Sequence, residues 1–166
     1  MCQKLFKHIK KILMIKIDVF VRDKNWKKYI PNPEKYLNKK AKLINFKKEF
    51  KKAKNVNFSI LLTGNKEIKF LNKKFRKKNK ITDVLSFPYY SLNERRKNLK
   101  NKTNIYLGDI ALNFYKINRI KKNFKKEFNK LWIHGFLHLL GYKHDKNKDF
   151  YEMKKLEDKI FKQIKC

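Results

Sequence analysis

Two stretches in the N-terminal half of the chain have an apolar residue at every second position. Isoleucine and valine alternate with other residues over 14–21, and Val, Phe, Ile and Leu do so over 56–62. Because side chains of a strand point alternately to its two faces, this period of two predicts two strands with one buried face each. The apolar segments "DVLSFP" at 83–88 and "IYLGDIAL" at 105–112 predict a third strand, ended by Pro88, and a fourth.

Apolar residues at helical spacing dominate most of the remaining chain. Asn32 is a suitable N-cap with Pro33 at the first helical position, and we predict that this helix covers residues 33–50. The polar residues 89–104 predict a flexible loop. One stripe near the C-terminus is expected to face the core: Phe150, Met153, Leu156, Ile160 and Ile164. The other predicted helices are a short one after the turn at 64–65, 116–128 in pieces, 129–141 and 149–165.

The order of these elements is strand, helix, strand, helix, strand, strand and then helices. It predicts an α+β fold in which a small mixed four-stranded sheet is packed with about five helices. The length of 166 residues fits one domain with a real core. We assign residues 14–166 to a single catalytic domain and residues 1–13 to a basic N-terminal extension, with Met14 as an alternative start.

The chain is strongly basic, with 46 Lys and Arg residues against 14 Asp and Glu and a formal net charge of +32. Such a field favours polyanionic partners such as nucleic acid, because each neutralised phosphate releases condensed counterions. The alternative is compositional drift: Lys, Asn, Ile and Phe are enriched together, and most lysines would then be solvated surface. Charge alone does not decide between the two.

Cysteine usage and the N-terminal segment indicate the compartment. Cys2 and Cys166 stand at opposite ends of the chain, so they form neither a disulfide framework nor a C-x-x-C pair, which favours the reducing cytoplasm. Residues 1–13 are basic, but their apolar run is short and no small-residue cleavage site follows. We therefore expect neither a signal peptide nor a membrane span.

The strongest chemical signal is "HGFLHLLGYKH" at 134–144, which contains three of the four histidines. His134 and His138 are four residues apart, so a helix places both imidazoles on one face. Gly141 then allows the backbone to turn and to return His144 toward the same point. Three neutral imidazoles suit one Zn²⁺ ion and leave a fourth position for water, as in catalytic zinc sites. A lone histidine in an apolar helix is usually a hydrogen-bonded core residue, but three left without partners would cost about 1–3 kcal/mol each.

This spacing also occurs in the metzincin peptidases, H-E-x-x-H-x-x-G-x-x-H. There the Glu after the first histidine is the general base for the attacking water, whereas this chain has Gly135. The peptidase interpretation therefore lacks its base. A phosphodiester substrate has oxygens of its own that can help to manage the proton, which favours a nuclease.

Three segments together closely resemble the YbeY family of metal-dependent endoribonucleases, which mature bacterial ribosomal RNA. They are "HGFLHLLGYKH" (134–144), "FLNKKFRKKNKITDVLSFP" (70–88) and "YLGDIALN" (106–113). The resemblance extends from about residue 14 to the C-terminal helix, nearly the whole chain.

The resemblance implies a set of site residues. The zinc-binding histidines of the family fall on His134, His138 and His144, and its conserved arginine falls on Arg76. A guanidinium is suited to such a role because it donates parallel hydrogen bonds to a phosphate and stays charged. The chain departs from the usual "GYDH" of the family: it reads "GYKHD", with Lys143 before the third histidine and Asp145 after it.

Neighbouring polar and aromatic residues have a structural interpretation beside the functional one. Thr82 and Asp83 are expected to shape the turn into the third strand, because Asp accepts hydrogen bonds from nearby backbone N–H groups. Asp109 is expected to support the fold or to orient a ligand. Three tyrosines are expected either to stack on unpaired bases or to pack at the rim of the core: Tyr89, Tyr90 and Tyr142.

The resemblance implies a zinc-dependent endoribonuclease acting on single-stranded RNA in ribosomal RNA maturation and ribosome quality control. Its partners would be ribosomal RNA and the ribosome or small ribosomal subunit, with no membrane and no DNA. Unpaired substrate is expected because the major groove of A-form RNA excludes side chains. Two alternatives remain: a zinc metallopeptidase of metzincin-like spacing, and a non-catalytic ribosome-assembly module that binds RNA and zinc.

Overall fold

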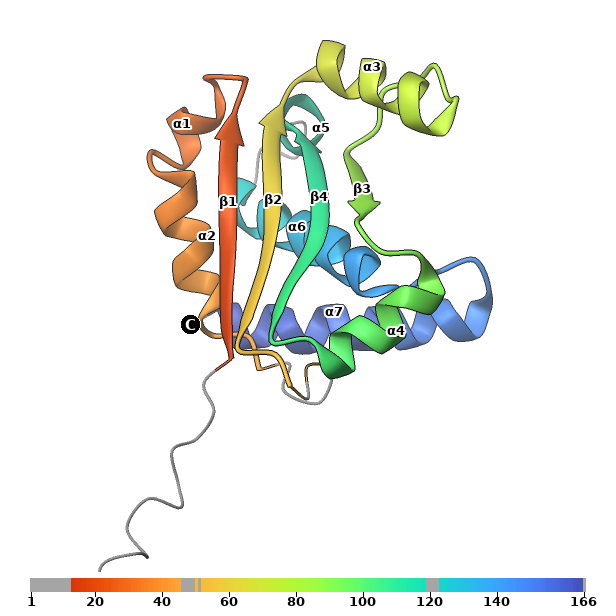
Figure 1. Cartoon of the computed structure of the whole chain (residues 1–166). Helices are drawn as coiled ribbons and strands as arrows, with labels where there is room; N and C mark the ends of the chain where they lie inside the picture. The colour runs from red at the N-terminus through yellow and green to blue at the C-terminus, as the bar shows by residue number, and fades with distance from the viewer. Residues whose placement is uncertain (1–12, 46–49, 51, 119–122, 166) are drawn as a thin grey trace, which may run out of the picture.

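The computed structural model describes residues 13–45, 50, 52–118 and 123–165, which form a mixed sheet of four strands and seven helices. The predicted α+β class is confirmed, and two more helices are present than the five expected (Figure 1). The strands lie in the order β1-β2-β4-β3, and β3 pairs antiparallel with β4 at one edge while the other neighbours are parallel. Their bounds are β1 Met14–Val21, β2 Asn55–Thr63, β3 Val84–Pro88 and β4 Asn104–Asn113.

The alternating apolar side chains predicted from the sequence are buried on one face of the sheet. In β2, Val56, Phe58, Ile60 and Leu62 are fully buried. In β4 the alternation changes phase at Gly108, whose φ is 128°. Two residues of β4 there face one of β2, which is a bulge, and a Cβ at Gly108 would lie 2.1 Å from the carbonyl oxygen of Phe87. The bulge keeps the residues before and after it directed at the same core.

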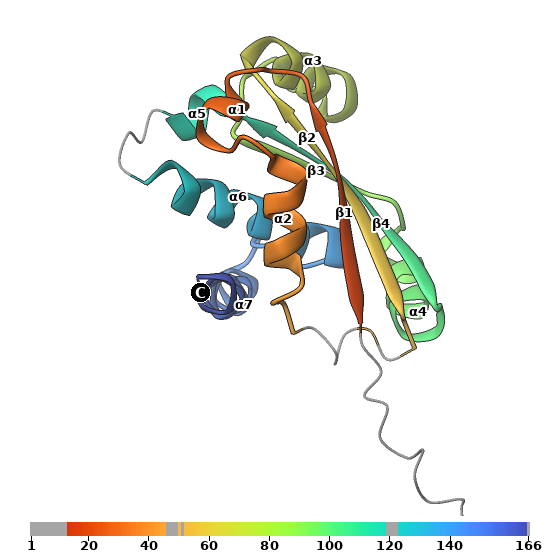
Figure 2. The ribbon, with the colours of Figure 1, turned by 90° about the vertical axis from the view of Figure 1, so that its left-hand side faces the viewer.

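Three helices cover one face of the sheet, as Figure 2 shows: α2 (Pro33–Ala41), α6 (Phe124–Leu140) and α7 (Asn147–Ile164). The helix α2 packs on β1, α6 packs on β3 and β4, and α7 packs on α6. The core between them contains Trp26, Phe58, Phe128, Trp132 and Phe136, and burial of each large side chain stabilises the fold by about 1.5–3 kcal/mol. Short helices α1 (Trp26–Tyr29) and α5 (Phe114–Asn118) follow β1 and β4.

The helix α3 (Asn65–Arg76) lies at the carboxyl end of β2 (Figure 1). Its Ile68 forms a small buried cluster with Leu85 of β3 and Ala111 of β4, apart from the main core. The helix ends with Lys77 in the left-handed region, at φ 58°. Arg76 therefore stands at the last helical position, close in space to β3, which follows after a short connection.

The structure contains a helix, α4 (Leu92–Asn101), where the sequence predicted a loop over 89–104. A capping box stabilises its start: the Ser91 side chain accepts a hydrogen bond from the Glu94 N–H, and the Glu94 carboxylate accepts one from the Ser91 N–H. Leu99 is buried and ties the helix to the core. Local capping and two buried side chains, Leu99 and Arg95, hold a helix whose other residues are almost all polar.

Two further predictions were wrong in detail. The helix expected over 33–50 ends at Ala41, and residues 42–45 are not helical. Phe150, expected in the core-facing stripe, is 50% exposed, whereas Met153, Ile160 and Ile164 are buried. Phe150 lies in the first turn of α7.

The predicted extension, residues 1–13, lies outside the described residues except for Leu13, which is partly buried against the core. Cys2 and Cys166 also lie outside them. No helix in the described part of the chain has the length and apolar character that crossing a bilayer requires.

Candidate metal centre

The C-terminal end of α6 and the turn after it bring the three histidines together. His134 and His138 lie on the last turns of the helix. Gly141 ends it in the left-handed region at φ 101°, with its N–H donating to His138 and the Tyr142 N–H donating to the Leu137 carbonyl. This hydrogen-bonded glycine cap reverses the chain direction. His144 then reaches the same point, as predicted.

The three imidazoles form one compact group. One ring nitrogen from each of His134, His138 and His144 lies within 4.8 Å of the other two. The ring centroids are separated by 4.5 to 5.4 Å. His134 and His138 are partly buried, and His144 is exposed. The group therefore combines a fixed interior side with one ring open to solvent, which is the form of a site that could hold a metal ion and still admit a substrate.

The hydrogen bonds of two histidines fix the direction of their lone pairs. The Nδ1 of His138 lies 2.9 Å from the Tyr142 carbonyl oxygen, and the Nδ1 of His134 lies 2.7 Å from Oε1 of Glu157. Both oxygens are acceptors, so both Nδ1 atoms carry the proton. The Nε2 lone pairs consequently face each other across 2.9 Å. Two lone pairs at this distance repel unless a cation lies between them, so the donor set fits a metal ion.

The electrostatics keep His138 neutral. Burial lowers the pKa of His138 from its ordinary value of 6.5 to about 4, and the neighbouring His134, His144 and Arg76 add to the effect, while the hydrogen bond to the Tyr142 carbonyl opposes it. A neutral imidazole has the lone pair that a metal ligand needs. At neutral pH His138 is therefore in the protonation state required for coordination.

A cavity of about 440 Å³ adjoins the centre at His138. Its lining comes from four separate parts of the chain: α3, β3 with the segment after it, α4, and the end of α6 with the turn after it. Arg76 and His138 both line it, which brings the predicted arginine and a predicted ligand to one space. Arg95 and Lys143 add positive charge to the same wall.

Arg76 is held beside the centre by a short chain of contacts. Its NH2 group donates to the Ser86 carbonyl at 3.0 Å. The buried hydroxyl of Ser86 in turn lies 3.3 Å from the carbonyl oxygen of Gly135, between the two helical histidines. Strand β3 is therefore the spacer that sets the position of the guanidinium relative to α6.

Gly135 packs closely against Ile110 of the sheet. A Cβ at this position would lie 2.8 Å from Cγ2 of Ile110 in β4. The residue after the first histidine thus faces the sheet, and a glutamate could not stand there without displacing the Ile110 side chain. The general base of the metzincin pattern has no equivalent at this position.

Three of the other predicted residues, Thr82, Asp83 and Asp109, lie away from the cavity at the histidines. Asp83 accepts hydrogen bonds from the Val84 N–H at 2.9 Å and from Thr82, which confirms its role in the turn, and neither Thr82 nor Asp83 lines the cavity at the histidines. Asp109 accepts from the Tyr106 hydroxyl at 2.7 Å and is exposed on the face of the sheet opposite to α6. These two carboxylates stabilise local structure, and neither lines the cavity at the histidines.

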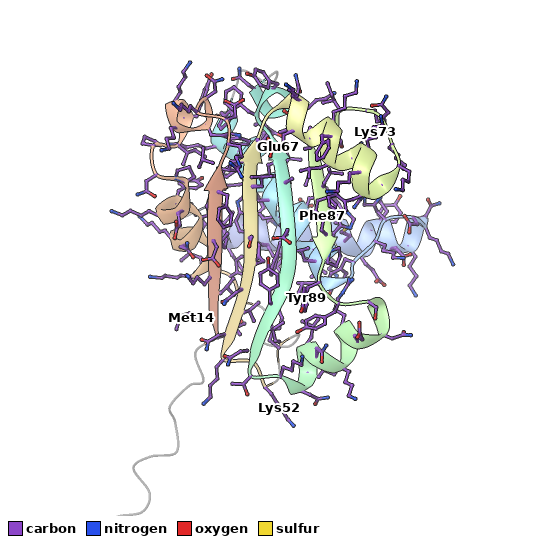
Figure 3. All side chains as sticks on the ribbon, turned by 45° about the horizontal axis from the view of Figure 1, so that its top comes forward. Met14, Lys52, Glu67, Lys73, Phe87 and Tyr89 are labelled. Carbon is purple, nitrogen blue, oxygen red and sulfur yellow. The ribbon has the colours of Figure 1, made fainter. Side chains whose placement is uncertain are left out.

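The three tyrosines and Lys143 do line the cavity. Tyr89 is the most exposed of the three tyrosines, at 67%, and its ring packs edge-on against Tyr90 and Tyr106. Figure 3 shows it just beyond the end of β3, beside β4, where the chain leads into α4. Asp145, next to the third histidine, is exposed and does not line the cavity.

Sequence reasoning missed two residues of the site. Glu157 of α7 forms the hydrogen bond that orients His134. Arg95 of α4 is 7% exposed and donates to the carbonyl of His138. Neither is adjacent to the histidines in sequence, so only the packing of α7 and α4 against α6 reveals them. The spacing Ser91-x-x-Glu94 was the one sequence signal for α4.

Fold and site together define an α+β protein with a three-histidine centre, which could hold a metal ion, at the wall of a basic cavity. The sequence profile described as "Endoribonuclease YbeY" matches residues 20–165. The chain belongs to the YbeY family, which confirms the resemblance seen in its motifs.

Individual relatives match this chain over most of their own lengths. A Pelagibacter ubique (strain HTCC1062) protein named Endoribonuclease YbeY is 46% identical over 156 residues, which cover 92% of this chain and 97% of the relative. A protein of the same name from Buchnera aphidicola subsp. Schizaphis graminum is 37% identical over 142 residues, 82% of this chain and 83% of the relative. The solution structure of TM1509 from Thermotoga maritima superposes with a TM-score of 0.53 at 27% identity, covering 91% and 89% of the two chains.

Proposed function

We propose that this protein is a zinc-dependent endoribonuclease that cleaves single-stranded RNA. The observation that carries the proposal is the convergence of three imidazole nitrogens, within 4.8 Å of one another, beside a cavity that is lined by His138 and Arg76. The relatives named Endoribonuclease YbeY support RNA as the substrate. Residues 14–166 act in this proposal as one catalytic domain.

His134, His138 and His144 would hold one Zn²⁺ ion. Imidazole nitrogens are preferred zinc ligands, and three of them leave one coordination position open, as catalytic zinc sites require. A zinc ion held there would supply Lewis-acid chemistry toward a phosphoryl oxygen of the substrate. Glu157 and the Tyr142 carbonyl hold the protons on the far side of two rings, so their lone pairs stay directed at the ion.

Arg76 would bind the phosphate that is cleaved. A guanidinium has five N–H donors, of which one nitrogen is engaged with the Ser86 carbonyl, and the remaining donors can bind phosphate oxygens. Because the arginine is permanently charged, it also stabilises the additional negative charge that develops in the transition state. Its position on the same cavity as His138 allows both groups to act on one phosphodiester.

The cavity suits an unpaired strand. Its rim has the exposed ring of Tyr89, on which a splayed base can stack, and Lys143 is available to a flanking phosphate. The overall charge of +32 adds affinity that does not depend on base sequence. Target choice would then come from context, and we propose ribosomal RNA and the small ribosomal subunit as that context, in the cytoplasm, with a role in rRNA maturation and ribosome quality control.

The proposal is tested with purified full-length protein, wild type and His138→Ala, after measuring bound metal in both. Each is incubated with a single-stranded RNA, a duplex RNA, a single-stranded DNA of the same sequence, and casein. We expect about one zinc ion per wild-type chain, cleavage of the single-stranded RNA alone, and loss of both zinc and cleavage in the variant.

The same experiment separates the alternatives. Cleavage of casein with RNA left intact would favour a peptidase, against which the position of Gly135 argues. Zinc and RNA binding without any histidine-dependent cleavage would indicate a non-catalytic assembly module. RNA cleavage that survives His138→Ala would contradict the proposed centre.

A further inference from the structure

Arg95 of α4 is a buried cation without a counter-charge. Its side chain is 7% exposed, and its Nε is buried with no hydrogen-bond partner. No carboxylate among the described residues forms an ion pair with it. Burial lowers the pKa of this guanidinium. A buried charge is costly unless its surroundings repay it, so the contacts that Arg95 does make define its role.

Those contacts lead to the metal centre. The NH2 group of Arg95 donates to the Tyr90 carbonyl at 3.1 Å, and the NH1 group donates to the His138 carbonyl at 3.3 Å. One planar group thus bridges the segment after β3 and the last turn of α6. The His138 carbonyl, which also accepts the N–H of Gly141, is one of the last carbonyl groups of the helix, where the partial negative charge favours a cation.

Arg95 also supports the turn that leads to His144. A Cβ at Gly141 would lie 2.7 Å from the NH1 atom of Arg95, so the guanidinium is packed directly against this glycine. Gly141 separates His138 from His144 in the chain and has the left-handed conformation that reverses it. The arginine therefore contacts the backbone of one candidate ligand and the hinge that places another.

Arg95 can affect metal binding through its charge and through the backbone that it holds, and we expect the backbone effect to be the larger. A cation near a metal site repels the ion, and on that basis alone removal of Arg95 would strengthen metal binding. The hydrogen bond of Arg95 to the His138 carbonyl and its close packing against Gly141, in contrast, act directly on the backbone that holds the candidate ligands.

We propose that Arg95 is a positioning residue of the metal centre. By bridging the Tyr90 and His138 carbonyls it fixes the end of α6 and the turn to His144, so that the three imidazoles are aligned before an ion binds. The helix α4, which lines the cavity through Arg95, is thereby fastened to the centre. This inference rests on the three-histidine centre of the proposed function, although not on RNA cleavage.

The test is the zinc affinity of the full chain, measured without RNA by competition with a chromophoric chelator. The variants are Arg95→Lys and Arg95→Gln, with Lys97→Gln as the matched control, because Lys97 is an exposed cation on the same helix. We expect both Arg95 variants to bind zinc about tenfold more weakly, as changes to groups that orient metal ligands do. Lysine should not rescue affinity, because a single ammonium cannot hold the fork geometry of a guanidinium between two carbonyls. The control should match wild type.

Thermal unfolding of the metal-free proteins completes the design. Unchanged zinc affinity in both Arg95 variants, with or without a lower melting temperature, would overturn the proposal and leave a purely structural arginine. Wild-type affinity in Arg95→Lys together with weaker binding in Arg95→Gln would overturn it in favour of a charge effect. Failure of wild type to bind zinc would overturn the centre itself, and absence of RNA cleavage with intact zinc binding would affect only the proposed function.

Discussion

The Nδ1 atom of His134 on α6 lies 2.7 Å from Oε1 of Glu157 on α7. This pair joins the two C-terminal helices at the centre, and it determines which nitrogen of His134 faces the other histidines. A carboxylate that accepts the far N–H of a metal-binding imidazole also makes that imidazole a stronger ligand. The terminal helix is therefore part of the site as well as of the core.

Removal of the Glu157 carboxylate should weaken zinc binding. We expect about a tenfold loss in Glu157→Ala and a smaller one in Glu157→Gln, whose amide oxygen still accepts a hydrogen bond. Chelator competition measures both. Glu152→Gln is the matched control, because this carboxylate is exposed on the same helix. Equal affinity in Glu157→Ala and wild type would show that the hydrogen bond does not serve the metal.

Acid should destabilise the metal-free protein through His138. Its pKa is about 4 in the folded state and 6.5 ordinarily, so between these values the unfolded chain binds a proton that the folded chain does not. The free energy of unfolding therefore falls as pH decreases from 6.5 toward 4, and the effect is absent above 6.5. Urea unfolding in the presence of a chelator, compared between wild type and His138→Gln, measures this contribution. The variant should show the shallower decline, and parallel curves would refute the assignment.

Arg76 should be required for cleavage but not for metal binding. We expect Arg76→Ala to lower kcat/KM by about 100-fold, the usual cost of removing one donor to a developing negative charge. Arg76→Lys should recover part of the loss, since it keeps the charge but not the paired donors. The matched control is Arg22→Ala, an exposed arginine that does not line this cavity. A loss of similar size in the control would mean that bulk charge, rather than the position of Arg76, supports activity.

The contact between Gly135 and Ile110 should make the position after the first histidine intolerant of side chains. A Cβ there lies 2.8 Å from Ile110 Cγ2, so Gly135→Ala should destabilise the protein by about 1–3 kcal/mol in urea unfolding. The same substitution in an Ile110→Ala background should cost less, because the opposing atoms are gone. Strict additivity of the two changes would argue against this contact.

Deletion of residues 1–13 tests the proposed domain boundary. We expect the shortened chain to unfold at nearly the same temperature and to retain RNA cleavage, because β1 begins at Met14 and the family profile matches from residue 20. Leu13 is partly buried against the core, so deletion of 1–12 is the matched control for that single contact. Loss of folding in both shortened chains would contradict the boundary.

The sequence predicted the elements whose pattern is local. Alternating apolar residues located β1 and β2, Asn32 and Pro33 located the start of α2, and the spacing of His134 and His138 placed both on one face of α6. The turn at Gly141 was also predictable, because a glycine after an apolar helix is the usual cap. These features depend on residues within a few positions of one another.

The elements that were missed depend on tertiary contacts. The segment containing α4 is almost entirely polar, so its helix is defined by a capping box and by the buried Leu99 and Arg95 rather than by an apolar stripe. The contact of Glu157 with His134 spans 23 residues, and that of Arg95 with His138 spans 43. No local pattern reveals such pairs, because they follow from how α4 and α7 pack against α6.

The most direct measurement for the central claim is anomalous X-ray scattering at the zinc edge from crystals of the zinc-loaded protein. One peak is predicted, about 2.0–2.1 Å from a ring nitrogen of each of His134, His138 and His144. A peak at any other place, or none at the three histidines in fully loaded protein, would contradict the account.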